Sequence, residues 1–455
     1  MGMQSINPAD GSVIQTYQGM SRDDMYQVLE RSHHTWLEWK KTSFEERSKL
    51  MKRAADLLRE RSGRYGEMIT REMGKTRKSA IGEVEKCAWV CDYYADKALE
   101  FLSEEPIKTE AADSFITYNP LGVVLAVMPW NFPFWQVFRF AAPALMAGNT
   151  GLLKHASNVP GSALAIEEVF RDAGFPADAF RSLLVKTSLI DELLEHEYIT
   201  AATLTGSGPA GSAVASKAGK MLKKTVLELG GSDPYVVLED ADLEAAASTC
   251  VTSRLINGGQ SCIAAKRFIV VESVLQEFTD LFVKGMKDAV MDDPMLDGST
   301  LGPMAREDLR DELHEQVQKS IMQGAACLLG GEVPDREGYW YPPTVLVNVR
   351  PGMVAFDDEL FGPVAAIVSA RDENEAIELA NKSVFGLGAA VFTRDLERGR
   401  RIAAEELEAG SCFVNELVKS DPRLPFGGIK TSGYGRELSH LGIREFTNIK
   451  TVYVK

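Results

Sequence analysis

Lys223-Lys-Thr-Val-Leu-Glu-Leu-Gly-Gly-Ser-Asp-Pro234, near the middle of the chain, indicates a strand that ends in a tight turn. Residues 225–229 are β-branched or apolar, as in a buried strand, and the following glycine pair ends it. Glu228 is therefore expected at the carboxyl end of a strand. Open α/β sheets bind their ligands at that end, so this carboxylate is a candidate functional group.

A second segment, Asn257-Gly-Gly-Gln-Ser-Cys262, is too rich in glycine for a helix or a strand. Glycine lets backbone N–H groups approach a ligand closely, and a thiol beside free N–H groups can act as a nucleophile with an oxyanion site. A single cysteine is more often a small buried apolar residue. A catalytic role for Cys262 and Glu228 therefore needs support from the rest of the sequence.

Composition excludes several classes of function. The chain has 455 residues, which allows about three domains, and its formal charge of -15 opposes binding to nucleic acids or anionic membranes. Its six cysteines form no CxxC pair and its six histidines lack metal-ligand spacing. We expect reduced thiols, a cytoplasmic location without a signal peptide, and no metal.

The most apolar segment, residues 122–148, is long enough to cross a bilayer. It is interrupted by prolines and polar residues, which are Pro129, Asn131, Pro133, Gln136, Arg139 and Pro143. Such residues are rare in membrane spans. The segment is better explained by a buried strand, a tight loop and a core helix.

Alternating strands and helices predict the fold class. Helices with capping-box spacing are expected from Ser21 and Ser43, with a third over 78–102. Strands and helices then alternate over 151–229 and again over 235–406. This predicts an α/β fold with two doubly wound, Rossmann-like domains and a cleft between them. The sequence Gly206-Ser-Gly-Pro-Ala-Gly211 lies between a strand and a helix and could hold a phosphate, although the motif alone is weak.

We assign residues 1–103 and 121–231 to a dinucleotide-binding domain and residues 232–424 to a catalytic domain. Residues 104–120 and 425–455 are assigned to an oligomerisation and bridging segment. Residues 106–118 form a hairpin candidate that leaves the first domain. A protruding hairpin often joins the sheet of a neighbouring chain, so a homodimer or a dimer of dimers is expected.

Several separated motifs together resemble the aldehyde dehydrogenase superfamily over nearly the whole chain. They are Pro129-Trp-Asn-Phe-Pro133, Leu204-Thr-Gly-Ser207, Leu227-Glu-Leu-Gly-Gly231, Gly259-Gln-Ser-Cys262, Glu359-Leu-Phe-Gly-Pro363 and the glycine-rich tail over 426–437. The resemblance implies that Cys262 attacks an aldehyde, that the Asn131 amide and the Cys262 N–H hold the oxyanion, and that Glu228 activates water to hydrolyse the thioester. Glu228 is then the base and not a ribose ligand.

The resemblance also implies a nicotinamide dinucleotide site. Its pyrophosphate would lie near Gly206, Ser207 and Gly211, Trp130 would line its channel, and Glu359 and Phe361 would hold the nicotinamide ribose and ring. Lys154 matches the lysine that reaches the adenosine ribose. Many NAD-using relatives have a glutamate three residues later, where this chain has Ser157. The serine removes a charge that would repel a 2′-phosphate, so NADP is expected to be preferred, with NAD also used.

The small-molecule substrate is expected to be an aldehyde with a second, charged end. Arg139 lies eight residues after Asn131 and matches an arginine of succinate-semialdehyde dehydrogenases. A buried guanidinium needs an anion, which would be either the substrate carboxylate or an internal one. Ser420 matches a carboxylate-binding serine of the same enzymes. Trp135 and Phe426 complete the expected substrate site, and Arg254 could replace the family's second arginine, because Ile256 occupies that position.

Alternative functions remain open from sequence alone. They are another semialdehyde or broad-specificity dehydrogenase that uses NAD, an acylating enzyme that transfers the thioester to coenzyme A, a generic cysteine hydrolase, and a binding protein on a retired dehydrogenase scaffold. The presence of Glu228 argues against the acylating enzyme. The joint presence of Asn131, Glu228 and Cys262 argues against the retired scaffold.

Overall fold

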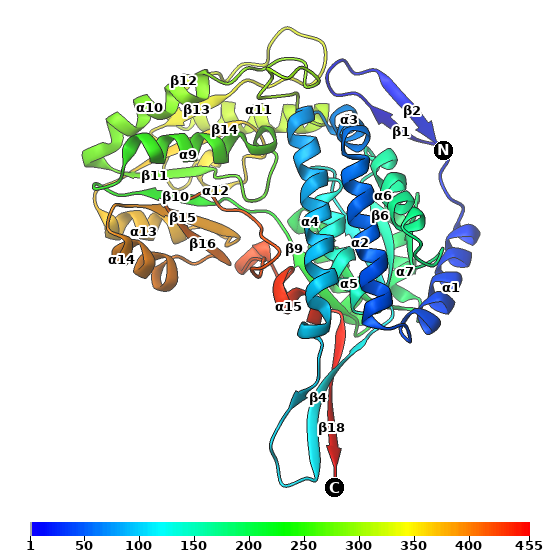
Figure 1. Ribbon diagram of the computed structural model, residues 1–455. Coiled ribbons are helices and arrows are strands. Elements are labelled where there is room, and N and C mark those ends of the chain that lie inside the picture. The colour runs from blue at the N-terminus through cyan, green and yellow to red at the C-terminus, as the bar shows by residue number, and fades with distance from the viewer. Residues whose placement is uncertain (1) are drawn as a thin grey trace.

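The computed structural model describes residues 2–455 and contains two α/β units and a projecting arm (Figure 1). The first sheet has the order β17-β9-β8-β5-β6-β7, and all neighbours are parallel except β17 and β9. Its strands are β5 (Val123–Met128), β6 (Thr150–His155), β7 (Phe180–Ser182), β8 (Ile199–Thr205), β9 (Lys224–Glu228) and β17 (Gly433–Tyr434).

Helices cover both faces of this sheet, as the alternating side chains of β5 show. Val124 and Ala126 pack into a core with the helices α2, α3, α4, α5 and α6, whereas Val123 and Leu125 pack with α1, α7 and α8 on the other face. These helices are α1 (Arg22–Trp39), α2 (Phe44–Glu60), α3 (Ser62–Met73), α4 (Arg77–Phe101), α5 (Trp135–Met146), α6 (Pro160–Asp172), α7 (Ile190–Glu195) and α8 (Gly208–Lys220).

The second sheet has the order β12-β13-β14-β11-β10-β15-β16 and is parallel except for β12. Its strands are β10 (Pro234–Val237), β11 (Arg267–Val271), β12 (Ala326–Leu329), β13 (Thr344–Val347), β14 (Val364–Ala370), β15 (Gly388–Phe392) and β16 (Ser411–Val414). Two hydrophobic cores lie on its two faces, one with α9 (Leu243–Leu255) and α10 (Leu275–Lys287), the other with α11 (Glu307–Met322), α12 (Val354–Asp357) and α13 (Glu373–Asn381). The predicted pair of doubly wound sheets is confirmed.

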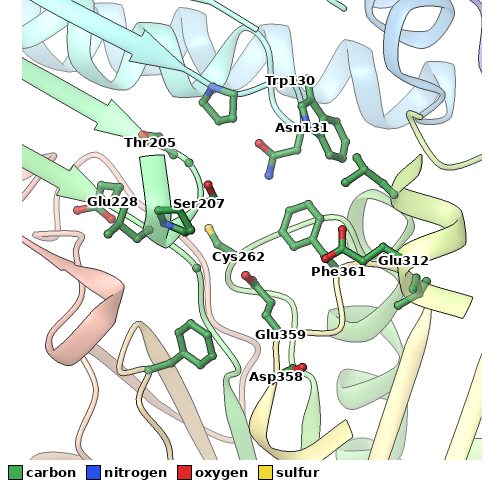
Figure 2. A pocket seen from close by; sticks show the side chains of 18 of the residues that line it. Trp130, Asn131, Thr205, Ser207, Glu228, Cys262, Glu312, Asp358, Glu359 and Phe361 are labelled. Carbon is green, nitrogen blue, oxygen red and sulfur yellow. The ribbon is translucent and has the colours of Figure 1, made fainter. Parts of the chain in front are cut away.

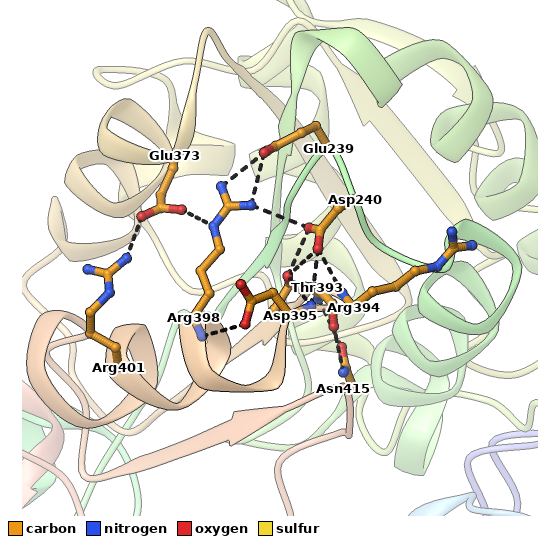
Figure 3. Close-up of polar contacts among 9 residues, drawn as sticks. All are labelled: Glu239, Asp240, Glu373, Thr393, Arg394, Asp395, Arg398, Arg401 and Asn415. Atoms are coloured by element: carbon orange, nitrogen blue, oxygen red, sulfur yellow. Dashed lines mark hydrogen bonds and ion pairs between the residues drawn. The ribbon is translucent and has the colours of Figure 1, made fainter.

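The carboxyl edge of the second sheet is closed by ion pairs (Figure 3). Arg398, on α14 (Leu396–Arg401), pairs with Glu239 after β10 at 2.9 Å and with Glu373 after β14. Asp240 accepts hydrogen bonds from the hydroxyl of Thr393 and from backbone N–H groups that follow β15. This edge is therefore occupied by the protein's own charges. The cleft between the two α/β units lies at the opposite edge, before the amino ends of the strands.

The N-terminal helices begin largely where the sequence predicts. The hydroxyls of Ser21 and Ser43 accept the N–H groups of Asp24 and Glu46 at 3.1 Å. Helix α3 was not predicted, because Arg61 precedes it and makes no side-chain cap. The short segments α12, β16, β17 and α15 (Ser439–Arg444) were not predicted either. The strands β1 (Met3–Ile6) and β2 (Val13–Tyr17) pair antiparallel before α1.

The apolar segment 122–148 forms β5, a loop and α5, as predicted. The Glu83 carboxylate accepts the N–H groups of Phe134 and Trp135 at the start of α5, and its charge is paired with Lys75. All residues of α5 are buried inside the protein. In residues 2–455, no helix combines the length and apolarity needed to cross a bilayer.

The arm is a three-stranded sheet that projects from the first α/β unit (Figure 1). It contains β3 (Glu105–Pro106), β4 (Asp113–Pro120) and β18 (Thr447–Val454), and β18 pairs antiparallel with β4 along its whole length. The expected hairpin therefore does leave the body, but its main partner is the C-terminal strand. Ile449 and Tyr453 on β18 are exposed.

Candidate active site

One cavity of about 580 Å³ opens between the two α/β units (Figure 2). It lies at the carboxyl ends of β5, β8 and β9 in the first sheet, and before the amino ends of β11, β14 and β15 in the second. It is lined by eight of the residues that the sequence predicted, which are Trp130, Asn131, Gly206, Ser207, Glu228, Cys262, Glu359 and Phe361. The structure therefore brings the three predicted catalytic residues and five predicted cofactor residues together.

The loop before Cys262 has an unusual backbone. Asn257, Gly258 and Gly259 have φ angles of 55°, 65° and 75°, and a Cβ on Gly259 would lie 2.1 Å from the carbonyl oxygen of Gly362. Such close approach at positive φ requires glycine. The glycine content of this segment is thus explained by a compact turn that presents the thiol to the cavity.

Two buried basic side chains donate hydrogen bonds to backbone oxygens of this loop. Lys266 donates to the backbone oxygens of Ser261 and Cys262 at 2.8 and 2.6 Å, and its charge is 3.2 Å from Glu359. Arg254 donates to the carbonyl of Gly259 at 2.6 Å and has no exposed surface. The Arg254 guanidinium is therefore enclosed and supports the loop before Cys262, and its contact with substrate stays a prediction.

Burial controls the protonation of the nucleophile. Removal from water raises the pKa of the Cys262 thiol to about 12, although the charges of Lys266 and Arg139 act in the opposite direction. The thiol is therefore protonated in the unliganded protein at neutral pH. Reaction needs a base in the same cavity, because the thiolate is the attacking form.

Asn131 is hydrogen-bonded to the loop that precedes Cys262. Its side-chain N–H donates to the carbonyl of Gln260 at 3.1 Å, and its own carbonyl accepts from the Asn257 side chain at 2.8 Å. Its amide and the Cys262 thiol point into the same space (Figure 2). An amide donor fixed beside the sulfur is the arrangement needed to hold an oxyanion.

Glu228 ends β9 and is almost fully buried. Neither carboxylate oxygen has a hydrogen-bond partner among residues 2–455. Burial, followed by the neighbouring Glu437 charge, raises the pKa of Glu228 well above its usual range. A carboxylate with this raised pKa is a stronger base, which suits proton abstraction.

Arg139 forms a buried ion pair with Glu437 and lies 4.6 Å from the ring centre of Phe426. The anion beside this arginine is therefore an internal carboxylate, which was one of the two readings left open. Arg139 does not line the cavity of Figure 2. Its role as a substrate clamp stays a prediction.

The cofactor residues occupy the same cavity from several elements. The carboxylate of Glu359 accepts the Gly231 N–H at 3.1 Å, and the Phe361 ring meets Trp130 edge to face at 5.9 Å. Gly211 does not line the cavity, because it packs against Leu229, whose Cδ2 would lie 2.5 Å from an added Cβ. Gly211 therefore allows close packing of α8 against the strand end, and its role beside the pyrophosphate stays a prediction.

Some cavity residues were missed from sequence. Thr205 lies inside a quoted motif but had no role, whereas Glu312 and Gln316 come from α11, which carries no motif. They reach the cavity only because the fold places α11 beside it.

Lys154 and Ser157 line a second cavity of about 610 Å³, together with Lys186. The Lys154 ammonium is buried and, among residues 2–455, donates only to the carbonyl of His155, at 2.8 Å. The residues that line this cavity include two lysines and no acid. Its charge suits an anionic group, such as the phosphate of an adenosine 2′-phosphate.

The remaining substrate candidates form a separate cluster. The indole N–H of Trp135 donates to the Ser420 hydroxyl at 3.1 Å, and the ammonium of Lys86 donates to the same hydroxyl at 3.0 Å. Lys86 was not predicted from sequence, because it lies on α4 inside a helical pattern with no motif. Trp135 and Phe426 share a hydrophobic core with the partly buried Cys262.

A comparison with known protein families decides the assignment. Residues 1–452 match the model described as "Aldehyde dehydrogenase family". The chain belongs to the aldehyde dehydrogenase family. Members oxidise aldehydes to acids, so the enzyme class predicted from sequence is confirmed.

Relatives of this dehydrogenase match it along its whole length. It is 50% identical to a "Probable succinate-semialdehyde dehydrogenase [NADP(+)]" of Synechocystis, covering 100% of both chains. It is 48% identical to "Succinate semialdehyde dehydrogenase [NAD(P)+] Sad" of Escherichia coli, covering 99% of this chain and 97% of the relative. A solved succinic semialdehyde dehydrogenase from Streptococcus pyogenes, in complex with NADP+, is 39% identical with a TM-score of 0.97 and 99% coverage of both chains.

In this dehydrogenase, replacing Asn131 by alanine should lower kcat by roughly 10²-fold to 10³-fold, because one oxyanion donor is lost. Steady-state formation of reduced cofactor measures the effect. Asn158→Ala, a polar change outside the cavity, is the matched control and should leave kcat within about twofold. An Asn131→Ala enzyme with unchanged kcat would exclude the amide from the oxyanion site.

Proposed function

We propose that this enzyme oxidises succinate semialdehyde to succinate and prefers NADP+ to NAD+. The observation that carries the proposal is the full-length similarity, at 47–50% identity, to enzymes named for this substrate, combined with an intact catalytic trio in one cavity. The basic cavity at Lys154 and Ser157 supports the cofactor preference.

The residues of the cavity suggest a sequence of steps. The Cys262 thiol gives its proton to a base and its sulfur attacks the aldehyde carbon, which forms a thiohemiacetal. The Asn131 amide and the Cys262 N–H stabilise the oxyanion that develops on the former aldehyde oxygen. The dinucleotide, when bound, supplies the hydride acceptor. Glu228 then removes a proton from water, and the resulting attack on the Cys262 thioester releases the acid and the thiol.

The chain's own residues fit a dinucleotide. Ser207 is the N-cap residue of α8, makes no side-chain cap hydrogen bond and lines the cavity, so the amino end of this helix suits a pyrophosphate. Glu359 is positioned by Lys266 and Gly231, and its carboxylate can accept hydrogen bonds from ribose hydroxyls. Lys154 and Ser157 would hold the adenosine end.

A panel of aldehydes tests the substrate. Succinate semialdehyde and butanal have the same carbon count but differ in the terminal carboxylate. The proposal expects a higher kcat/KM for succinate semialdehyde, measured as absorbance of the reduced cofactor, and no stimulation by coenzyme A. An equal or higher value for butanal would contradict the proposed substrate, and faster turnover with coenzyme A would indicate the acylating enzyme.

Ser157→Glu should reverse the cofactor preference. A carboxylate there would repel the 2′-phosphate, so kcat/KM with NADP+ should fall roughly 10-fold to 100-fold while the value with NAD+ is kept or raised. Ser273→Glu adds the same charge to an exposed residue that lines neither cavity and serves as the control. A wild-type enzyme whose kcat/KM favours NAD+ by more than about tenfold would contradict the NADP assignment.

We also infer that the arm joins two copies of the chain. Its outer strands expose apolar side chains at Ile107, Ile449 and Tyr453, and unpaired strand edges favour association. A molar mass in solution equal to one chain would contradict the dimer or dimer of dimers.

All six cysteines are free, which supports a reducing cytosol as the location.

A further inference from the structure

Lys86 is a partly buried cation without an acidic partner. It lies on α4, its ammonium is 3.0 Å from the Ser420 hydroxyl oxygen, and it stands 4.2 Å from the ring centre of Trp135. No carboxylate of residues 2–455 is within ion-pair distance of it. An enclosed ammonium with one neutral acceptor is costly unless an anion joins it.

Glu83 and Asp421, the carboxylates whose charges act on Lys86, are already engaged, and so is Glu437. Glu83 pairs with Lys75 and caps α5, and Asp421 pairs with Arg423 at 2.6 Å. Glu437 pairs with Arg139. Burial, followed by the Arg139 charge, lowers the pKa of Lys86 to about 8. An added carboxylate would therefore find an unneutralised positive charge at this point.

The cluster around Lys86 offers more than one donor. The Ser420 oxygen accepts from both Lys86 and the Trp135 indole, and no acceptor for its own hydrogen is found in the part of the chain described. The ammonium has three N–H groups, of which one is used by Ser420. A carboxylate could therefore accept hydrogen bonds from both Lys86 and Ser420.

The same cluster is linked to the segment of Asn131 through Trp135. Trp135 lies four residues after Asn131, at the start of α5. Its hydrophobic core also contains Phe426, with Phe132, Cys262 and Ile263 packed against it. The Arg139 charge acts on both Lys86 and Cys262. None of Lys86, Trp135 and Ser420 lines the cofactor cavity, so they can contact a substrate without displacing the dinucleotide.

We propose that Lys86 binds the distal carboxylate of the substrate, with the Ser420 hydroxyl as a second donor. This inference rests on the proposed function, because it assumes a semialdehyde with a terminal carboxylate. Lys86 acts as a substrate-binding and specificity-determining residue, and the chemistry at Cys262 does not pass through it. The chemical class that it selects is an aldehyde with an anionic end.

The test compares two aldehydes in wild type and Lys86→Met. Loss of a charged hydrogen bond should lower kcat/KM for succinate semialdehyde roughly 10-fold to 100-fold, mainly through KM, and change butanal by no more than about twofold. Lys86→Arg keeps the charge and should retain most of the discrimination. Lys78→Met removes a charge from an exposed residue of the same helix. It should leave kcat/KM unchanged for both aldehydes.

A second measurement does not depend on turnover of the semialdehyde. Succinate should inhibit butanal oxidation competitively in wild type, and this inhibition should weaken at least about tenfold in Lys86→Met, whereas Lys86→Arg should keep it. Equal losses for both aldehydes, or unchanged inhibition by succinate, would overturn the role of Lys86. A wild-type enzyme that fails to prefer succinate semialdehyde would instead contradict the proposed function, which separates the two failures.

Discussion

Replacing Cys262 by alanine is expected to lower kcat for aldehyde oxidation by at least about 10⁴-fold, because the covalent intermediate can no longer form. No other cysteine of residues 2–455 can substitute. Cys87, Cys91 and Cys250 are fully buried away from the cavity, and neither Cys327 nor Cys412 lines it.

Formation of reduced cofactor at saturating aldehyde measures this loss. Binding of reduced cofactor, followed by its fluorescence, should be retained in Cys262→Ala, which shows that the cavity is still formed. Cys412→Ala changes a partly buried cysteine outside the cavity and should keep kcat within about twofold. Substantial turnover by Cys262→Ala would mean that the thiol is not the nucleophile.

Replacing Glu228 by glutamine should separate the two halves of the reaction. Thioester hydrolysis loses its base, and general base catalysis contributes roughly 10²-fold to 10⁴-fold. A rapid burst of about one reduced cofactor per active site should then precede slow turnover. Stopped-flow absorbance measures the burst, and Glu315→Gln, on the exposed face of α11, serves as the control.

The pH dependence of hydrolysis follows from the burial of Glu228. Its pKa lies well above the ordinary 4.5, and only the ionised form can accept a proton. The hydrolysis rate of wild type should therefore fall as pH decreases through this raised pKa, at a pH above 4.5. Glu228→Gln should lack this acidic limb. A burst-free Glu228→Gln enzyme, or one with the wild-type pH profile, would remove Glu228 from the hydrolytic step.

Local patterns explain why much of the fold and the reacting centre could be predicted. β9 and its glycine pair are encoded within a few residues, as are the capping boxes at Ser21 and Ser43. Glu228 is the last residue of β9, and Cys262 follows the glycine-rich turn over 257–259. Helix α3 lacked a capping signal and escaped notice.

Contacts between distant parts of the chain could not be predicted in the same way. Arg139 and Glu437 form an ion pair although they are far apart in the sequence, and Lys86 contacts Ser420 from a position on α4 that carries no motif. Arg254 looked suitable for a substrate because of its place near Cys262, but its enclosure depends on the fold of the 257–259 turn. Charges of this kind acquire their partners only in the folded chain, and their spacing in the sequence does not identify those partners.

The position of the site also follows from topology. The first sheet contributes its carboxyl edge, which carries Thr205 and Glu228, whereas the second sheet contributes the loops before its strands, with Cys262 and Glu359. The carboxyl edge of the second sheet is filled by the ion pairs around Arg398. The nucleophile and the base therefore come from different units and meet only in the folded protein.

Mass spectrometry of Glu228→Gln, quenched in acid after mixing with succinate semialdehyde and NADP+, tests covalent catalysis most directly. The predicted result is a mass increase equal to one succinyl group, located by peptide mapping on Cys262 and absent when the dinucleotide is omitted before quenching. An unmodified Cys262 under conditions that produce the burst, or a succinyl group on another residue, would contradict the mechanism.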